Sequence, residues 1–197
     1  HTTSLLAAIH EAKGRQSIQT TIRPDILGTL VAVARIQSTD ASNRIEGIST
    51  SDSRLNDLVS EKVTPRNRNE EEIAGYRDAL SVIHESHDYI PITPNVILQL
   101  HRDLFRHTPL TFAGHFKDSD NVIIERDAHG TSTVRFAPPS ALVTPELIER
   151  ACSAYTQAIR DGHTDPLLAI AMFILDFTCI HPFNDGNGRM SRLLTLL

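Results

Sequence analysis

Residues 167–192, LLAIAMFILDFTCIHPFNDGNGRMSR, decide both the fold and the chemistry of this 197-residue chain. The first nine residues of this stretch are apolar on every side of a helix, which predicts a central buried helix over residues 165–180. Pro182 then ends that helix, and the two glycines that flank Asn187 predict a short loop before a new helix begins near Arg189. The stretch therefore predicts a buried rod that carries a polar loop at its end.

The rest of the chain predicts a mainly α-helical fold, because apolar residues recur at helical spacing along most of it. One segment differs: residues 121–136 contain two β-prone runs around Asp127–Gly130, which predict a small β-hairpin. A polar loop is expected over residues 60–70. Besides the central helix, the spacing predicts helices over residues 4–13, 25–37, 69–86, 94–106 and 145–160.

The composition excludes several classes of protein. Hydrophobic residues make up 40% and charged residues 22%, which is typical of a globular chain and not of a disordered or collagen-like one. The net charge of −5 argues against broad nucleic-acid binding, and no apolar run is long enough to cross a bilayer. Cys152 and Cys179 lie in apolar periodic stretches, so we expect two buried thiols and a reducing cytoplasm.

The two ends of the chain suggest that more sequence surrounds it. His1 stands where a start methionine would be, and no secretory signal follows it, so we expect a processed or trimmed beginning. Leu197 ends an apolar helical run without a stop signal, so we expect further residues after it.

The loop after the central helix has the features of a phosphate site. Gly186 and Gly188 allow backbone N–H groups around Asn187 to point into one concavity, and the following helix adds the partial positive charge of its N-terminus. Arg189 and Arg192 are three residues apart and can lean toward the same bound group. Amides, a helix end and two arginines together predict binding of a polyphosphate.

Two further residues of the loop suggest a reaction. Asp185 lies at the mouth of the loop, where its carboxylate can hold Mg²⁺ that bridges phosphate oxygens. His181, four residues earlier, is a candidate general base for an incoming hydroxyl. The plainer alternative is a turn between helices, with a capping histidine and solvated arginines.

Residues 181–192, HPFNDGNGRMSR, match the pattern H-x-F-x-[D/E]-G-N-G-R-x-x-R at every specified position, and the chain therefore resembles the Fic-domain family. The resemblance implies a Fic-type helical bundle with a β-hairpin flap over residues 70–197, preceded by an N-terminal helical region over residues 1–69. It also implies an adenylyltransferase that passes AMP from ATP to a Ser, Thr or Tyr hydroxyl of a target protein, or of the chain itself.

The same resemblance implies a role for each residue of the motif. His181 is expected to deprotonate the target hydroxyl, Asp185 to bind Mg²⁺ on the ATP phosphates, and Phe183 to anchor the loop in the core. An exposed edge of the flap would pair with an extended target segment. Lys117 stands where the family has arginine. The expected nucleotide contacts are an anion hole of Gly186, Asn187 and Gly188 and phosphate contacts from Arg189 and Arg192.

Residues 42–47, SNRIEG, resemble the inhibitory motif [S/T]-x-x-x-E-[G/N] that one class of the family carries before its core. In that class Glu46 would form a bidentate pair with Arg192 and withhold the guanidinium from the γ-phosphate, with Ser42 supporting the pair. The alternative is a helix cap beside a solvated glutamate. In some relatives the glutamate also supports removal of AMP from the target, so the resemblance gives Glu46 this hydrolytic role as an alternative.

Other readings compete with AMP transfer. The motif predicts which residues bind the phosphates of the nucleotide but does not specify its nucleobase. Transfer of UMP or of phosphocholine is therefore an alternative reaction, and a non-catalytic nucleotide-binding regulatory module is an alternative function. His101 begins an HRDL stretch similar to a kinase catalytic loop, but residue 108 is Thr where that loop needs Asn. His84 and His87 are three residues apart, which is wrong for a zinc-protease helix. The target protein and a homo-oligomeric state are left open.

Overall fold

The computed structural model describes residues 2–22, 24–127 and 130–197, and over these ranges it confirms a mainly α-helical fold with one two-stranded sheet. Two short 3₁₀ helices, His87–Tyr89 and Ala141–Val143, connect longer elements. The long elements in chain order are α1 Thr2–Ile22, α2 Pro24–Ile45, α3 Asp52–Val59, α4 Arg68–Ser86, α5 Pro94–Leu104, β1 Ile123–Arg126, β2 Ser132–Phe136, α6 Thr144–Asp161, α7 Pro166–Ile180 and α8 Asn187–Leu196.

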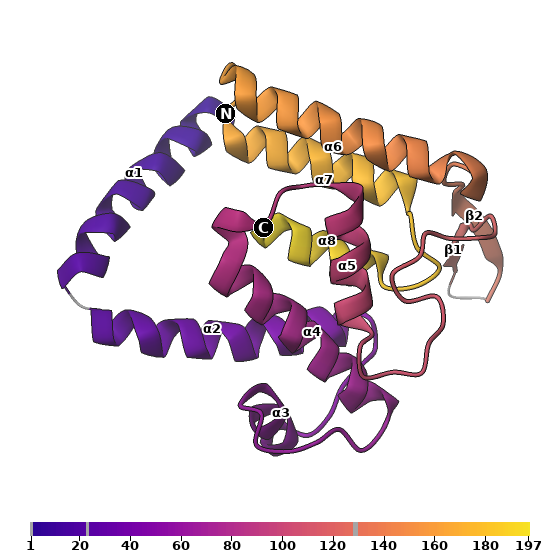
Figure 1. The fold of residues 1–197 in the computed structure, drawn as a ribbon, viewed down its shortest axis with the longest axis horizontal. Helices are drawn as coiled ribbons and strands as arrows, with labels where there is room; N and C mark the ends of the chain where they lie inside the picture. Colours follow the sequence, from indigo (N-terminus) through magenta and orange to yellow (C-terminus); the bar gives the residue numbers. More distant parts are fainter. Residues whose placement is uncertain (1, 23, 128–129) are drawn as a thin grey trace.

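The main core lies among α4, α5, α6, α7 and α8. In Figure 1, α6 and α7 run side by side, and α8 lies between α7 and α4. Each of the five helices contributes at least one side chain with at most 1% exposure, for example Tyr76, Leu104, Ile148, Phe177 and Met190. Burial of these apolar surfaces fixes the end of α7 and the start of α8 next to each other.

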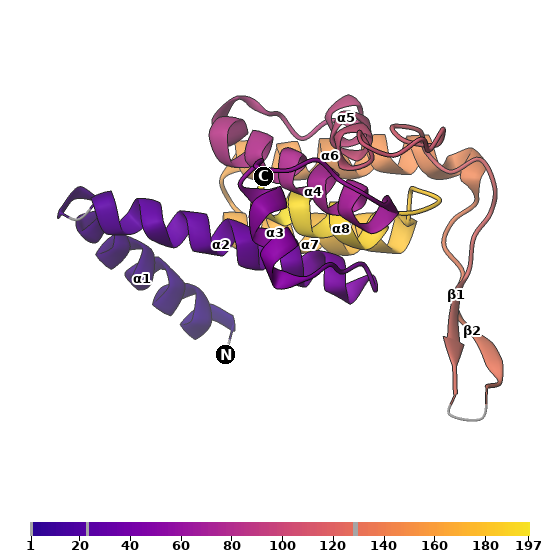
Figure 2. The ribbon, with the colours of Figure 1, turned by 90° about the horizontal axis from the view of Figure 1, so that it is seen from below.

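The predicted hairpin is present. Strands β1 and β2 pair antiparallel, with Ile124 opposite Val134, and the hairpin projects away from the helices in Figure 2. Both strands are largely exposed. Residues 128–129 of the predicted connection lie outside the described residues.

The prediction that α7 is buried on every side is wrong. Ala169, Phe173, Phe177 and Ile180 face the core, but Met172 and Leu175 are 64% and 62% exposed. No other described helix covers this second face. Cys179 is exposed for the same reason, which corrects the expectation of two buried thiols, whereas Cys152 is buried as predicted. In the described ranges no helix combines the length and apolarity needed to cross a membrane.

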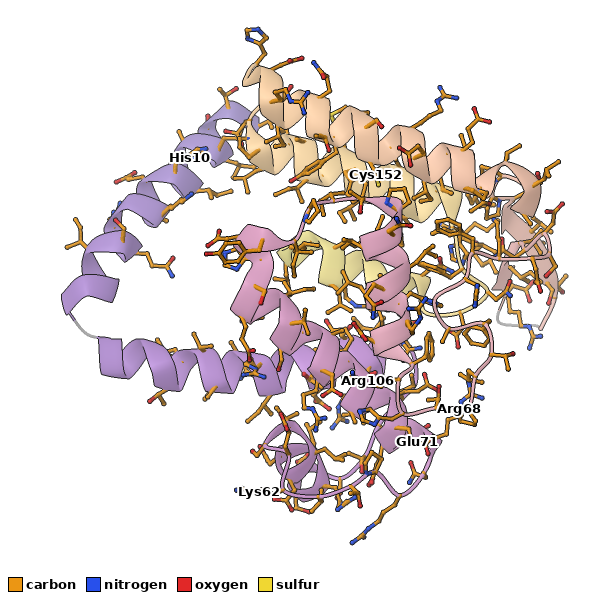
Figure 3. The ribbon with its side chains drawn as sticks, viewed as in Figure 1. His10, Lys62, Arg68, Glu71, Arg106 and Cys152 are labelled. Atoms are coloured by element: carbon orange, nitrogen blue, oxygen red, sulfur yellow. The ribbon has the colours of Figure 1, made fainter. Side chains whose placement is uncertain are left out.

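The N-terminal region has more helix than the sequence predicted. Helix α1 extends over 2–22 and α2 continues to Ile45, because its last turns bury Thr39, Ser42 and Asn43 and apolar spacing does not register polar burial. Helix α3 was missed, since eight residues with two buried leucines give too short a periodic signal. His10 of α1, labelled in Figure 3, lies 2.8 Å from Asp165 at the start of α7.

A buried ion pair connects α3 to α4 and makes the stability of the fold depend on pH. Glu70 is 3% exposed and accepts hydrogen bonds from Arg54, Thr50 and the backbone N–H of Arg66. These contacts, with Arg54 the largest contributor, lower the pKa of Glu70 from 4.5 to about 2. Because the folded pKa is depressed, this stabilisation is present above pH 4.5 and disappears as the pH falls toward 2.

We therefore expect Glu70→Gln to lower the free energy of unfolding by about 3 kcal/mol near neutral pH, because the Arg54 charge is left without its partner. Urea unfolding of both proteins checks this. The difference between them should shrink as the pH is lowered from 4.5 toward 2. Equal stability near neutral pH would show that the pair contributes nothing.

Candidate functional site

The proposed base lies at the C-terminal end of α7. Helix α7 starts at Pro166, with the Asp165 side chain accepting from the N–H of Leu167, and stops at Ile180. His181 adopts a left-handed backbone, φ +50°, and its N–H donates to the Phe177 carbonyl. A left-handed conformation is uncommon outside glycine, and here it turns the chain sharply into the polar loop. The helix end thus determines where the imidazole lies.

The surroundings of His181 favour the neutral imidazole. Burial lowers the pKa of His181 below its usual 6.5, the positive charge of Lys117 adds to this, and the Thr178 carbonyl offsets part of it. Ring Nδ1 is buried. A neutral imidazole with one ring nitrogen buried can accept a proton at the other.

Lys117, which the sequence analysis noted only as a departure from arginine, holds the loop. It is 3% exposed, and its Nζ donates to the Ile180 carbonyl at 3.2 Å and to Asn121 at 3.1 Å. Its backbone N–H donates to the Pro182 carbonyl, and the Asn121 amide donates to the Phe183 carbonyl. The segment before the hairpin therefore clasps the chain on both sides of His181.

Phe183 and Asn187 shape the inside of the loop. Phe183 is fully buried, and its ring stacks on His101 with centroids 3.7 Å apart. The Asn187 side chain accepts from the Phe183 N–H and donates to the Phe183 carbonyl, so it closes the loop instead of pointing into it. Gly186 has φ +81°, and a Cβ there would lie 2.9 Å from Phe105, so this position requires glycine.

The first turn of α8 faces the carboxylate of Glu46, which lies in the turn directly after α2. Arg192 donates from Nη2 to Glu46 Oε1 at 2.7 Å and to the Ser42 carbonyl at 2.9 Å, and from Nε to the Ser42 hydroxyl at 2.7 Å. The pairing of Glu46 with Arg192 is present, but the expectation of a bidentate pair is wrong, because Glu46 accepts from Nη2 alone while Ser42 accepts from Nε and Nη2. A Cβ on Gly188 would collide with Glu46 Oε1. Glu46 therefore covers the N-terminus of α8.

Arg189 lies in the interior. Its side chain is 1% exposed, Nη1 lies 2.7 Å from Glu72 Oε2, and the guanidinium sits 5.0 Å from the centroid of Phe105. Glu72 is also buried and accepts from Arg68. The structure thus gives Arg189 an acidic partner from α4, and a phosphate contact for it stays a prediction. No sequence pattern pointed to Glu72.

Asp185 has the properties expected of a magnesium ligand. Its side chain is 45% exposed at the mouth of the loop, and Oδ1 accepts from the Gly186 N–H at 2.6 Å. Arg68 and Arg189 lie 3.9 and 3.7 Å from it. Within the described ranges no three His, Cys, Asp or Glu side chains form a metal cluster. A single exposed carboxylate fits Mg²⁺ that takes its other ligands from phosphates and water.

A groove of about 440 Å³ runs beside this loop, between the base of the flap, α6 and α7. Its wall includes Phe136 of β2, Arg150 of α6, and Cys179 and Ile180, which directly precede His181. The site therefore gathers a proton acceptor, a carboxylate, a helix N-terminus and an open groove within one loop and its neighbours.

Comparison with known proteins identifies relatives of this chain. The family model described as Fic/DOC family matches residues 91–197. A Fido domain-containing protein of Dictyostelium discoideum is 37% identical over 83 residues, which cover 40% of this chain and 53% of that protein.

Solved structures agree on the fold. A Fic domain containing signaling protein from Bacteroides thetaiotaomicron superposes with a TM-score of 0.75 at 24% identity, over 87% of this chain and 64% of that one. A Fic family protein from Desulfovibrio desulfuricans superposes with a TM-score of 0.75 at 22% identity, over 98% of this chain and 55% of that one. Fic-1 from C. elegans superposes with a TM-score of 0.66 at 22% identity, over 98% of this chain and 57% of that one. The chain spans less than two thirds of each of these relatives.

Proposed function

This chain belongs to the Fic/DOC family, and on that premise we propose that it is a protein adenylyltransferase. It passes AMP from ATP to a Ser, Thr or Tyr hydroxyl of a target protein or of itself. The observation that carries the proposal is the loop at 181–188, in which a neutral imidazole, an exposed carboxylate and the N-terminus of α8 lie together. The alternative function, a non-catalytic nucleotide-binding module, does not require the neutral imidazole.

In the proposed reaction the target hydroxyl attacks the α-phosphorus of ATP. His181 accepts the hydroxyl proton at Nε2, because Nδ1 is buried. The new bond joins the hydroxyl oxygen to the α-phosphorus, and the bond to the β-phosphate oxygen breaks, so pyrophosphate leaves with its electron pair. Mg²⁺, held through Asp185, would neutralise charge on the phosphate oxygens.

The phosphates would lie over the first turn of α8. Its unpaired N–H groups and partial positive charge favour an anion there, and Arg192 is the accessible guanidinium beside it, with 30% exposure. In this position the γ-phosphate would compete with Glu46 for Arg192. The target would lie along the exposed flap, with the groove beside Ile180 available to its neighbouring side chains.

We further propose that Glu46 inhibits the reaction. Its carboxylate stands against Gly188 and on Arg192, where the proposal places the terminal phosphates, so the two anions exclude each other. Ser42 assists by accepting hydrogen bonds from Nε and Nη2 of Arg192. A role of Glu46 in removing AMP is the second reading of the same carboxylate, which could position a hydrolytic water.

The lowered pKa of His181 predicts a pH profile. Because the base acts in its neutral form, the rate of AMP transfer should rise with pH through an ionisation below 6.5 and stay level above it. Initial rates of a Glu46→Gly protein, measured in buffers of constant ionic strength, check this. An ionisation well above 6.5 would contradict the assigned surroundings of His181.

Pyrophosphate release separates the competing transfer reactions. We expect Glu46→Gly protein to release pyrophosphate from ATP faster than from GTP, CTP or UTP, and to leave CDP-choline unchanged. Preference for UTP would make the chain a UMP transferase, and turnover of CDP-choline a phosphocholine transferase. Binding of Mg·ATP without any release would support the regulatory module instead.

A further inference from the structure

His101 of α5 is a fully buried imidazole outside the family motif and next to the catalytic loop. Its exposure is 0%, so both ring nitrogens need partners in the protein interior. The backbone N–H of Gly114 donates to Nδ1 at 2.9 Å, and Nε2 lies 3.1 Å from the carbonyl oxygen of Asp185. An N–H group can only donate and a carbonyl can only accept, so Nδ1 carries no proton and Nε2 carries one.

The ring is fixed in place by aromatic neighbours. It is parallel to Phe183, with centroids 3.7 Å apart and an angle of 1°, and Phe105 meets it nearly edge-on at 5.1 Å. A histidine that stays neutral and wholly enclosed cannot exchange protons with a substrate, but it can serve as a rigid bridge.

From this geometry we propose that His101 is a positioning residue for Asp185: its Nε2–H fixes the Asp185 carbonyl, while the Gly186 N–H fixes the carboxylate. The other end of the bridge is Gly114, in the segment that leads through Lys117 to the flap. The importance of this bridge for Mg·ATP rests on the proposed function. Its effect on the backbone of the loop does not.

Two substitutions test the bridge in the full chain with a Glu46→Gly background. His101→Leu keeps an apolar side chain and removes both hydrogen bonds, whereas the amide of His101→Gln can still donate to the Asp185 carbonyl. Ile97→Val is the matched control, since Ile97 is equally buried one turn earlier on α5 and belongs to the hydrophobic core. Melting temperature is recorded for all of them.

The first readout is hydrogen exchange of the backbone amides of residues 184–187 without nucleotide. We expect His101→Leu to speed exchange there about tenfold, since the Asp185 carbonyl loses its hydrogen-bond donor, and His101→Gln to stay within about threefold of the parent. Ile97→Val should lower the melting temperature without this local change. Equal exchange in His101→Leu and Ile97→Val, or a His101→Gln protein that matches His101→Leu, would overturn the proposal.

The second readout is the Mg²⁺ concentration that half-saturates ATP binding, which should rise about tenfold in His101→Leu and recover in His101→Gln. If the parent binds no Mg·ATP at all, the proposed function fails while hydrogen exchange still decides the bridge. If His101→Leu does not fold, ¹⁵N NMR of labelled histidine in the unsubstituted chain decides it. A proton on Nδ1 of His101 would refute the bridge, and one on Nε2 alone would support it.

Discussion

His181→Ala in a Glu46→Gly background is expected to reduce AMP transfer by about 10²–10⁴-fold, the usual contribution of a positioned general base. Without the imidazole, the attacking hydroxyl has no neutral acceptor for its proton at the end of α7. Affinity for Mg·ATP should stay the same, because the proposed phosphate contacts lie on α8. Labelled ATP measures transfer, and equilibrium binding of ATP measures affinity.

His163→Ala is the matched control for this loss. His163 is exposed in the turn between α6 and α7, so its removal changes the histidine content without touching the site. It should transfer AMP at the parental rate. A His181→Ala protein that transfers AMP as fast as its parent would remove His181 from the reaction and leave the loop as a binding site only.

Glu46→Gly is expected to increase the affinity for Mg·ATP about tenfold and to increase AMP transfer at least as much. Breaking the ion pair is inexpensive, because Glu46 and Arg192 are 36% and 30% exposed and such pairs contribute about 0–1 kcal/mol. The larger gain comes from removing a carboxylate that excludes a phosphate from Gly188 and Arg192. Calorimetry and labelling of the two proteins measure both effects.

Glu61→Gly controls for net charge and for the introduced glycine. Glu61 has φ +57°, a conformation that suits glycine, and it lies in the turn after α3, away from Arg192. It should bind ATP like the unsubstituted chain. The ATP affinity of Glu46→Gln should fall between those of the unsubstituted chain and Glu46→Gly, because glutamine keeps the size of the side chain and loses its charge. Equal affinity and labelling in all four proteins would refute inhibition by Glu46.

The sequence predicted the parts of the fold that depend on apolar periodicity and turn chemistry. Helices α4 to α7 begin and end within two residues of their expected bounds, and the hairpin lies where two β-prone runs flank a turn. The prediction failed where burial is polar or one-sided. The end of α2 buries Ser42 and Asn43, which no apolar pattern registers, and α7 looks fully buried in sequence although Met172 and Leu175 face outward.

The candidate site divides in the same way. Local spacing in the motif predicted that His181 and Asp185 share one loop. The resemblance to a short inhibitory motif predicted that Glu46 pairs with Arg192. The supporting residues come from distant segments and have no local signature. His101 attracted notice only through a kinase-like HRDL stretch, and its contact with Asp185 spans 84 positions of the chain. Pairings of this kind depend on how helices pack and cannot be obtained from spacing alone.

Intact-mass analysis of the Glu46→Gly protein after incubation with Mg²⁺ and ATP tests the central proposal most directly. The account predicts a gain of one AMP unit on the chain itself or on an added target protein, and no gain when His181→Ala is also present. A Glu46→Gly protein that binds Mg·ATP but never yields an AMP adduct, on itself or on any protein of a cell extract, would contradict it.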